Sequence, residues 1–345
     1  MKALLSVLIL GCGMTAATIA PPAGTNYEQP QVAIGDGVSG VVFGSPDHVW
    51  FAASHDGGKT FGAPVQVAAV PGLMLGMHRG PRIAITKKEI VITAISNQTK
   101  GGSGNLVAWR SGDGGGTWSK EAQVNDLAAA AREGLHAMAA GPDGKLYAIW
   151  LDDRSKGKEL ALSMSVDGGA TWSKNQIVYS SPEGTICECC HPSIVVNDEG
   201  MVFAMFRNWL KGSRDMYLAT SRDGGKTFQT QKLGNETWKL NGCPMDGGGL
   251  AVSGRTVNVV YRRGNTIYVD EPGEPEVELG IGKNPATAGS VVLWSTAAGL
   301  MGQTSPGKPA LVDAKGAYPV AAERGGRVLV AWQSDGRIVV KDKLP

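Results

Sequence analysis

The eight residues SGDGGGTW, at positions 111–118, decide the fold because the chain carries four copies of this pattern. The aspartates of successive copies are 57, 54 and 56 residues apart. A fixed period of this length is typical of propellers and solenoids. The four copies read SHDGGKTF (54–61), SGDGGGTW (111–118), SVDGGATW (165–172) and SRDGGKTF (221–228).

Each copy follows a short run that favours a β-strand: HVWFAAS, NLVAWRS, ELALSMS or DMYLATS. The aspartate can accept backbone N–H bonds in an Asx-type turn, and the two glycines can supply positive φ angles. The pattern therefore predicts a turn that closes a hairpin. We interpret the four aspartates as structural residues, not catalytic ones.

This pattern resembles the Asp box, or bacterial neuraminidase repeat, of the sialidase superfamily. The resemblance implies an all-β propeller in which each Asp box joins the third and fourth strands of a blade, far from the substrate. It does not settle the chemistry, because unrelated functions share one fold.

The number of blades follows from counting candidate second strands. Seven short β-rich runs suit this role, which favours seven blades; six, the number that the resemblance to sialidases implies, is the alternative. We expect the final strand, Arg337–Asp342, to close the ring with a strand near Tyr27. The seven runs are Ser39–Gly44, Glu89–Ile95, Lys145–Trp150, Met201–Phe206, Thr256–Tyr261, Ser290–Trp294 and Arg327–Trp332.

Composition and charge fit one exported domain. The chain has 345 residues, 49 glycines and a formal net charge of +2. A balance so near zero gives no reason to expect a nucleic-acid partner. We expect residues 25–345 to form a single monomeric propeller domain.

The first 20 residues resemble an export signal, with Lys2 before a short apolar run. Ile9-Leu10-Gly11-Cys12 resembles a bacterial lipobox, which would lipidate Cys12 and make it the only membrane attachment. Cleavage near Ala20 is the alternative. We therefore expect a periplasmic protein, an outer-membrane lipoprotein or a secreted protein.

The loops that precede the innermost strands, and those that follow the second strands, should open on one face. The resemblance implies sialidase-type hydrolysis there. Three arginines would hold the carboxylate of an anionic sugar. A tyrosine would be the nucleophile and a carboxylate the acid/base. The arginines would be Arg82, Arg207 and Arg262, the nucleophile Tyr318, and the acid/base Glu133 or Asp152. The family's Arg-Ile-Pro motif reads Arg82-Ile-Ala here, and in the second predicted blade.

A second hypothesis is a module that binds a glycan or another small anionic ligand without catalysis and without a cofactor. Aromatic rings would stack on sugars, and polar neighbours would bind hydroxyl groups. The predicted substrate-binding residues are His78, Arg79, His136, His191, Trp209 and Asp246.

Four cysteines remain when Cys12 is set aside. Export favours disulfides, and we expect one bridge to reach Cys243. The alternative is a copper or zinc site of soft sulfur and imidazole ligands. The CECC and GCP segments also resemble those of poorly characterised bacterial propellers of this superfamily. The ligands of such a metal site would be Cys187, Cys189, Cys190, His191, Cys243 and Met245.

Overall fold

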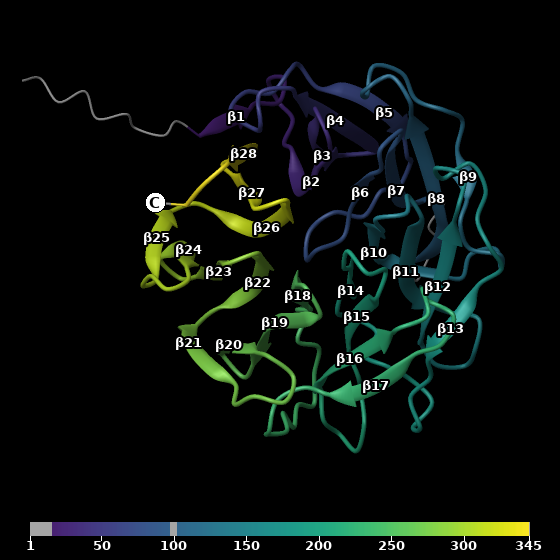
Figure 1. The fold of residues 1–345 in the computed structure, drawn as a ribbon, viewed down its shortest axis with the longest axis vertical. Helices are drawn as coiled ribbons and strands as arrows, with labels where there is room; N and C mark the ends of the chain where they lie inside the picture. The colour runs from purple at the N-terminus through teal and green to yellow at the C-terminus, as the bar shows by residue number, and fades with distance from the viewer. Residues whose placement is uncertain (1–15, 97–101, 345) are drawn as a thin grey trace, which may run out of the picture.

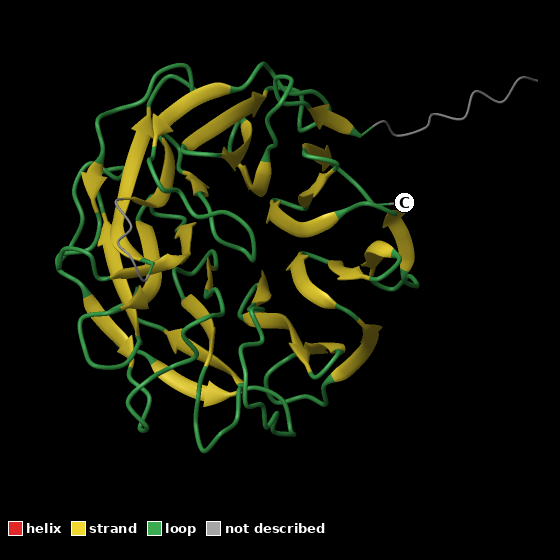
Figure 2. Ribbon diagram, turned by 180° about the vertical axis from the view of Figure 1, so that it is seen from behind, coloured by secondary structure: helices red, strands yellow, loops and turns green. Residues whose placement is uncertain are grey.

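The computed structural model describes residues 16–96 and 102–344. The predicted lipobox and Cys12 lie outside these residues. Strands are arranged around a central axis, and Figure 1 shows the ring from one face. The opposite view in Figure 2 contains strands and loops but no helix within the described residues. Accordingly, the described part of the chain holds no helix capable of crossing a bilayer.

The strands pair in consecutive antiparallel groups of four, each running outward from the axis. The first group is β2 (Glu28–Ile34), β3 (Ser39–Ser45), β4 (His48–Ser54) and β5 (Val65–Ala69). The second is β6 (Arg82–Ile85), β7 (Ile90–Ser96), β8 (Ser103–Ser111) and β9 (Ala122–Gln123). The third is β10 (Ala131–Ala140), β11 (Leu146–Asp152), β12 (Glu159–Ser165) and β13 (Gln176–Tyr179).

The remaining strands repeat this arrangement. The fourth group is β14 (Ser193–Val196), β15 (Val202–Arg207), β16 (Met216–Ser221) and β17 (Gln229–Lys232). The fifth is β18 (Gly248–Ser253), β19 (Thr256–Arg263), β20 (Thr266–Asp270) and β21 (Val277–Ile281). The sixth is β22 (Lys283–Ala288), β23 (Val291–Thr296), β24 (Gly299–Thr304) and β25 (Ala310–Asp313). The last is β26 (Ala317–Arg324), β27 (Arg327–Ser334), β28 (Arg337–Lys341) and β1 (Ala17–Ile19).

The strand pairing favours seven blades over six. Each of the seven runs predicted as a second strand overlaps the second strand of one group. The second and third groups are joined into one eight-stranded sheet, because β8 also pairs with β10. The fold is thus the expected all-β architecture.

The ring closes differently from our expectation. β28 pairs with β1, where Ala17 lies opposite Val340 and Ile19 opposite Ile338. The strand near Tyr27 is β2, which is the innermost strand of the first group, and Tyr27 itself donates a backbone hydrogen bond to Gly336. The folded region therefore begins before residue 25, inside the segment that the sequence assigned to an export signal.

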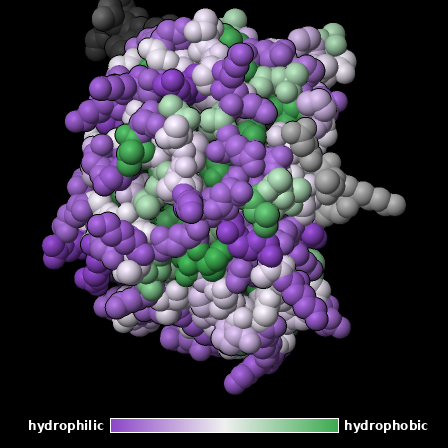
Figure 3. Space-filling view, turned by 90° about the vertical axis from the view of Figure 1, so that its right-hand side faces the viewer, coloured by the Kyte–Doolittle hydropathy of each residue, from purple (hydrophilic) through white to green (hydrophobic). Residues whose placement is uncertain are grey.

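The core lies between neighbouring groups. Val42 of β3, Ile83 of β6 and Ile92 of β7 share one buried cluster, so adjacent sheets pack face to face. Burying such side chains contributes about 1.5–3 kcal/mol each, as an upper estimate. The outer side in Figure 3 is mostly hydrophilic with small scattered apolar patches, so the apolar surface is used between the sheets.

The Asp boxes form the turns between the third and fourth strands, as the resemblance implied. In the second box, Asp113 accepts hydrogen bonds from Ser111 Oγ, the Gly116 and Thr117 N–H groups and Thr117 Oγ1. These bonds hold the pKa of the Asp113 carboxyl well below its usual value. The box is therefore a saturated structural turn.

Candidate functional site

The leading ends of the innermost strands β2, β6, β10, β14, β18, β22 and β26 lie on the face opposite the Asp boxes, because successive strands are antiparallel. In Figure 1 the segment before β6 bends towards the middle of the ring. Several residues here have left-handed backbone: Gln29 (φ 54°), His78 (62°), Asn284 (54°) and Tyr318 (51°). Non-glycine residues rarely adopt this conformation, and it concentrates at functional sites.

Two histidines from different groups stack at this face. The rings of His78, before β6, and His191, before β14, have centroids 4.2 Å apart and planes 27° apart. Tyr318 of β26 meets His78 edge-on, at 5.4 Å and 81°. Three predicted site residues, distant in sequence, therefore form one aromatic group.

Burial keeps the histidines of this face neutral. It lowers the pKa of His78 and lowers that of His191 well below the usual value. The Asp246 carboxylate and the Asn284 side chain oppose this effect at His78. His136, in β10, has its pKa lowered to about 3 by burial and by the Arg82 charge. Each neutral ring offers one donor and one acceptor.

Several buried polar atoms at the leading ends have no hydrogen-bond partner among the described residues. They are Gln29 Nε2, His78 Nε2, His191 Nδ1 and Asp246 Oδ1. Buried polar groups are almost always paired in folded proteins. An unpaired one costs about 1–3 kcal/mol, so these atoms mark a place where a ligand or water can bind.

Asp246, which precedes β18, links the fifth and sixth groups. Its Oδ2 lies 2.9 Å from Arg262 Nε and accepts a hydrogen bond from the backbone N–H of Asn284 at 3.0 Å. Asp246 is 1% exposed, so the Arg262 charge compensates a carboxylate that would otherwise be costly to bury. One oxygen is thereby fixed and the other is left unpaired.

The three arginines predicted to bind a carboxylate have other partners. Arg82 donates to the backbone carbonyls of His78, Gly80 and Pro81, and burial lowers its pKa to about 10. Arg207 donates to the carbonyls of Arg214, Asp246 and Arg262. Arg207 and Arg262 also flank the Trp238 ring, with 5.1 and 5.4 Å to its centroid. These contacts tie loops together.

The predicted acid/base carboxylates are also paired. Glu133 forms ion pairs with Arg79 and Arg132. Asp152, at the end of β11, is buried, binds Arg154 Nε at 2.7 Å and accepts a bond from Trp150 Nε1. The catalytic roles assigned to Glu133 and Asp152 stay predictions, and their contacts favour structural roles.

Trp209 contacts Arg214. It follows β15, is 38% exposed, and has one ring face covered by the Arg214 guanidinium at 4.4 Å. Its predicted role in sugar stacking stays a prediction.

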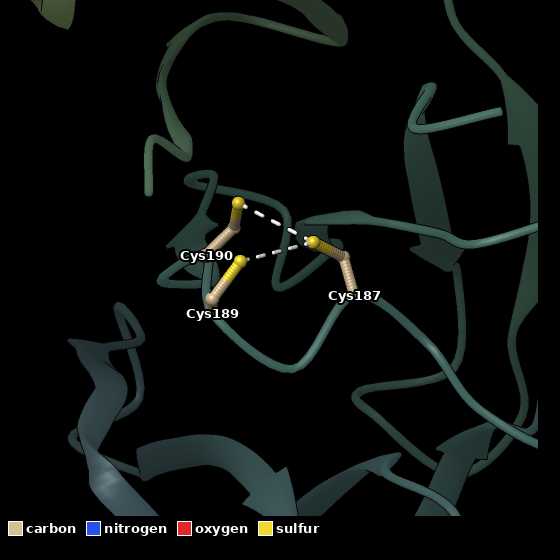
Figure 4. Close-up of side chains that lie close together, drawn as sticks. All are labelled: Cys187, Cys189 and Cys190. Atoms are coloured by element: carbon tan, nitrogen blue, oxygen red, sulfur yellow. Dashed lines mark hydrogen bonds between the residues drawn. The ribbon is translucent and has the colours of Figure 1, made fainter. Parts of the chain in front are cut away.

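The cysteines of the CECC segment form a thiol cluster of Cys187, Cys189 and Cys190, which Figure 4 shows pointing towards one another. Cys187 Sγ lies 3.6 Å from Cys189 Sγ and 3.5 Å from Cys190 Sγ. Hydrogen bonds from the other two thiols lower the pKa of Cys187, while burial raises that of Cys190 to about 12. Arg214 Nη1 lies 3.2 Å from Cys187 Sγ.

The expected disulfide to Cys243 is not formed. All four cysteines of the described chain are free thiols, and Cys243 is exposed while the thiol cluster is buried. Met245, by contrast, packs against the thiol cluster. The physical reason is local: the three close sulfurs share one loop, and Cys243 lies on the next.

Sequence reasoning missed Gln29 and Asn284. A signal was available, because Gln29-Pro30, Gly80-Pro81, His191-Pro192, Asn284-Pro285 and Tyr318-Pro319 all occur at or just before innermost strands. Proline restricts the residue before it. This recurring pair therefore marks the leading ends.

A family model described as a BNR repeat-like domain matches residues 49–252, more than half of the chain. No curated protein matches the sequence. Solved structures share the fold at low identity, so they speak to the fold alone.

One such structure is a Dyadobacter fermentans protein of unknown function, with 16% identity, a TM-score of 0.57 and coverage of 95% of this chain and 98% of that one. An α-L-arabinanase from Penicillium chrysogenum, complexed with arabinobiose, has 16% identity, a TM-score of 0.59 and coverage of 96% and 98%. A Trypanosoma rangeli sialidase has 13% identity and a TM-score of 0.54, with coverage of 94% of this chain but 57% of that one. The chain therefore belongs to the BNR repeat-like family.

Proposed function

We propose that the chain binds a glycan at the leading ends of its innermost strands. The observation that carries this proposal is the set of unpaired buried polar atoms around the histidine stack. A sugar presents many hydroxyl groups, each both donor and acceptor, and so can pair with neutral imidazole, amide and carboxylate groups together. The known glycan-active proteins that share the fold support the choice of ligand class.

The contacts favour a neutral sugar over a sugar acid. A bidentate clamp on a carboxylate needs guanidinium groups with free donors. Both terminal nitrogens of Arg82 and of Arg207 donate to backbone carbonyls, and Arg262 is paired with Asp246. The remaining polar groups of the face are mostly uncharged, which suits hydroxyl groups.

The same contacts favour binding over hydrolysis. Glycoside hydrolysis commonly uses two carboxyl groups on either side of the scissile bond. Glu133 and Asp152 are held by arginines, and Asp246 has one oxygen fixed by Arg262. Sialidase chemistry, with Tyr318 as nucleophile, is the second candidate because Tyr318 adjoins the histidine stack.

The test measures binding of arabinobiose and 3′-sialyllactose by titration calorimetry. We expect His78→Leu to weaken binding at least tenfold, about 1.4 kcal/mol, because it removes both ring nitrogens. The matched control is His55→Leu, an exposed histidine on an Asp-box hairpin, which should leave affinity unchanged. Equal binding by His78→Leu and the unaltered protein would contradict the proposal.

A fluorogenic sialoside and a fluorogenic arabinofuranoside separate binding from catalysis. We expect no turnover of either by the unaltered protein. Turnover that disappears in Tyr318→Phe would instead establish the enzyme and assign the nucleophile.

We also propose that the chain is exported and cleaved before Cys12. Cleavage near Ala20 would remove β1, whose three residues pair with β28. Cleavage before Cys12 keeps that strand, and the pairing therefore supports the lipid-anchored route. Mass spectrometry of the mature protein should find an acylated N-terminal Cys12, and a chain that begins at Pro21 would refute this route.

A further inference from the structure

The thiol cluster has the composition of a metal site, and it lies apart from the role proposed for the histidine stack. The ligand atoms of Cys187, Cys189 and Cys190 all lie within 4.8 Å of one another, and the three residues are buried. The backbone fixes the loop, because the Cys187 N–H donates to the Arg207 carbonyl at 2.9 Å. We propose that these three sulfurs bind a single soft metal ion, and that the ion is Cu(I).

The sulfur positions suit one shared ion. Cys187 Sγ is 3.5 and 3.6 Å from the other two sulfurs. With a metal–sulfur bond of about 2.3 Å, such a pair subtends an angle of roughly 100° at the ion. That value is near a tetrahedral angle and needs only a small outward movement to become trigonal. A disulfide would require two sulfurs to approach to about 2.05 Å.

Charge selects a monovalent ion. Three thiolates around a monovalent cation have a net charge of −2. Two nearby guanidinium groups can balance this charge. Arg214 Nη1 lies 3.2 Å from Cys187 Sγ, and the guanidinium group of Arg207 donates to the Arg214 carbonyl at 2.6 Å. With a divalent ion, the three thiolates and two guanidinium groups would leave a net charge of +1 at a buried site, and an uncompensated buried charge is costly.

Ligand softness selects the same ion. Thiolate and thioether ligands prefer Cu(I) among the common biological metals, although thiolates also bind zinc. Met245 packs against the thiol cluster, which places a thioether next to the three thiols. Cys243 is exposed and does not belong to the group of three.

The experiment is a competition titration of the full-length protein, reduced and kept free of oxygen. Cu(I) is supplied as its complex with the chromophoric chelator bicinchoninate, and transfer to the protein bleaches the colour. We expect one Cu(I) per chain. X-ray absorption should then show a first shell made of sulfur.

Cys187→Ser and, as a second variant, Cys190→Ser should each lower the affinity strongly. Outer-shell partners alone are worth about 10–100-fold in metal affinity, so loss of a ligand should cost more than about 100-fold. Cys243→Ser is the matched control and should bind as the unaltered protein does. Thermal melting of each variant confirms that it is folded.

Three outcomes would overturn the inference. The first is a folded, reduced protein that takes up no Cu(I), which would leave a dithiol or disulfide role for the loop. The second is a stronger preference for Zn(II), measured by the same competition. The third is loss of binding in Cys243→Ser. Sugar binding and Cu(I) binding are measured separately on the same protein, so failure of the glycan proposal and failure of this one are distinguishable.

Discussion

The Asp-box hairpins and the leading ends of the innermost strands are both rich in polar residues, but they differ in how those residues are paired. Asp113 is exposed and accepts four hydrogen bonds from its own turn. His78 and His191 have buried ring nitrogens with no partner in the described structure. The structural residues of this molecule therefore differ from those of the candidate site in whether their polar atoms are hydrogen-bonded, and not in residue type.

The same difference in hydrogen bonding exists among the residues at the leading ends of the innermost strands. Arg82 lies beside His78, yet both terminal nitrogens of its guanidinium group donate to backbone carbonyls. The candidate ligand-binding groups there are therefore the buried polar atoms that have no hydrogen-bond partner among the described residues. Arg82 and Arg207 donate to backbone carbonyls and Arg262 is ion-paired with Asp246, whereas His78 Nε2 and His191 Nδ1 are left without a partner in the described structure.

The largest expected effect on stability comes from adding a side chain at a glycine of an Asp box that packs against the neighbouring group of strands. Gly115 has φ +98°, and an added Cβ would lie 2.1 Å from Phe51 Cε1 of the preceding group. We expect Gly115→Ala to cost roughly 3–5 kcal/mol of unfolding free energy, since backbone strain and overpacking add. Urea denaturation measures this cost.

Gly114→Ala is the matched control for that change. Gly114 has φ +79° with open space around its Cβ position, so the substitution adds strain alone, about 1–2 kcal/mol. Equal costs for the two variants would show that packing of the box against its neighbour contributes nothing.

A smaller effect on the unfolding free energy should occur at a different pH for the buried histidines than for the Asp boxes. The folded pKa of His136, about 3, lies below its ordinary 6.5. On acidification the unfolded chain binds a proton first, so the stability contribution is full above pH 6.5 and is lost as pH falls towards 3. The slope is at most about 1.4 kcal/mol per pH unit for each such histidine. His78 and His191 act in the same direction.

The Asp boxes should respond only in stronger acid. The pKa of Asp167 is lowered from 3.8 to about 2, so its contribution is present above 3.8 and lost below that value. Urea midpoints measured between about pH 4 and 6.5 thus report on the buried histidines. We expect His136→Gln to reduce the slope over this range, with His78 and His191 still contributing, and the exposed His55→Gln to leave it unchanged. Urea midpoints of the unaltered protein that do not change between about pH 4 and 6.5 would contradict the predicted contribution of the buried histidines.

Much of the fold was predictable because its signals are local. The Asp-box turns depend on residues within eight positions of one another, and the second strands are short β-rich runs between turn residues. The leading face was predictable from topology, which placed His78, His191 and Tyr318 together.

The rest depends on tertiary contacts that no local pattern carries. Arg207 binds the carbonyls of three different segments, which only the folded ring brings near it. β1 was hidden because an apolar leader and a three-residue strand have similar composition. The burial of three thiols together and the exposure of Cys243 could not be inferred from the number of cysteines.

The pairing of β1 with β28 also sets the order in which the chain can fold. Residue 17 is synthesised well before residue 340, yet the two lie opposite each other in one sheet. At about 5–20 residues per second, β1 waits roughly 15–60 s for its partner. Contacts so distant in sequence form slowly, since a long loop must close before they stabilise anything. The sheet of β26, β27, β28 and β1 cannot be completed before β28 is made, and an interruption of synthesis before β28 leaves β1 without its partner strand.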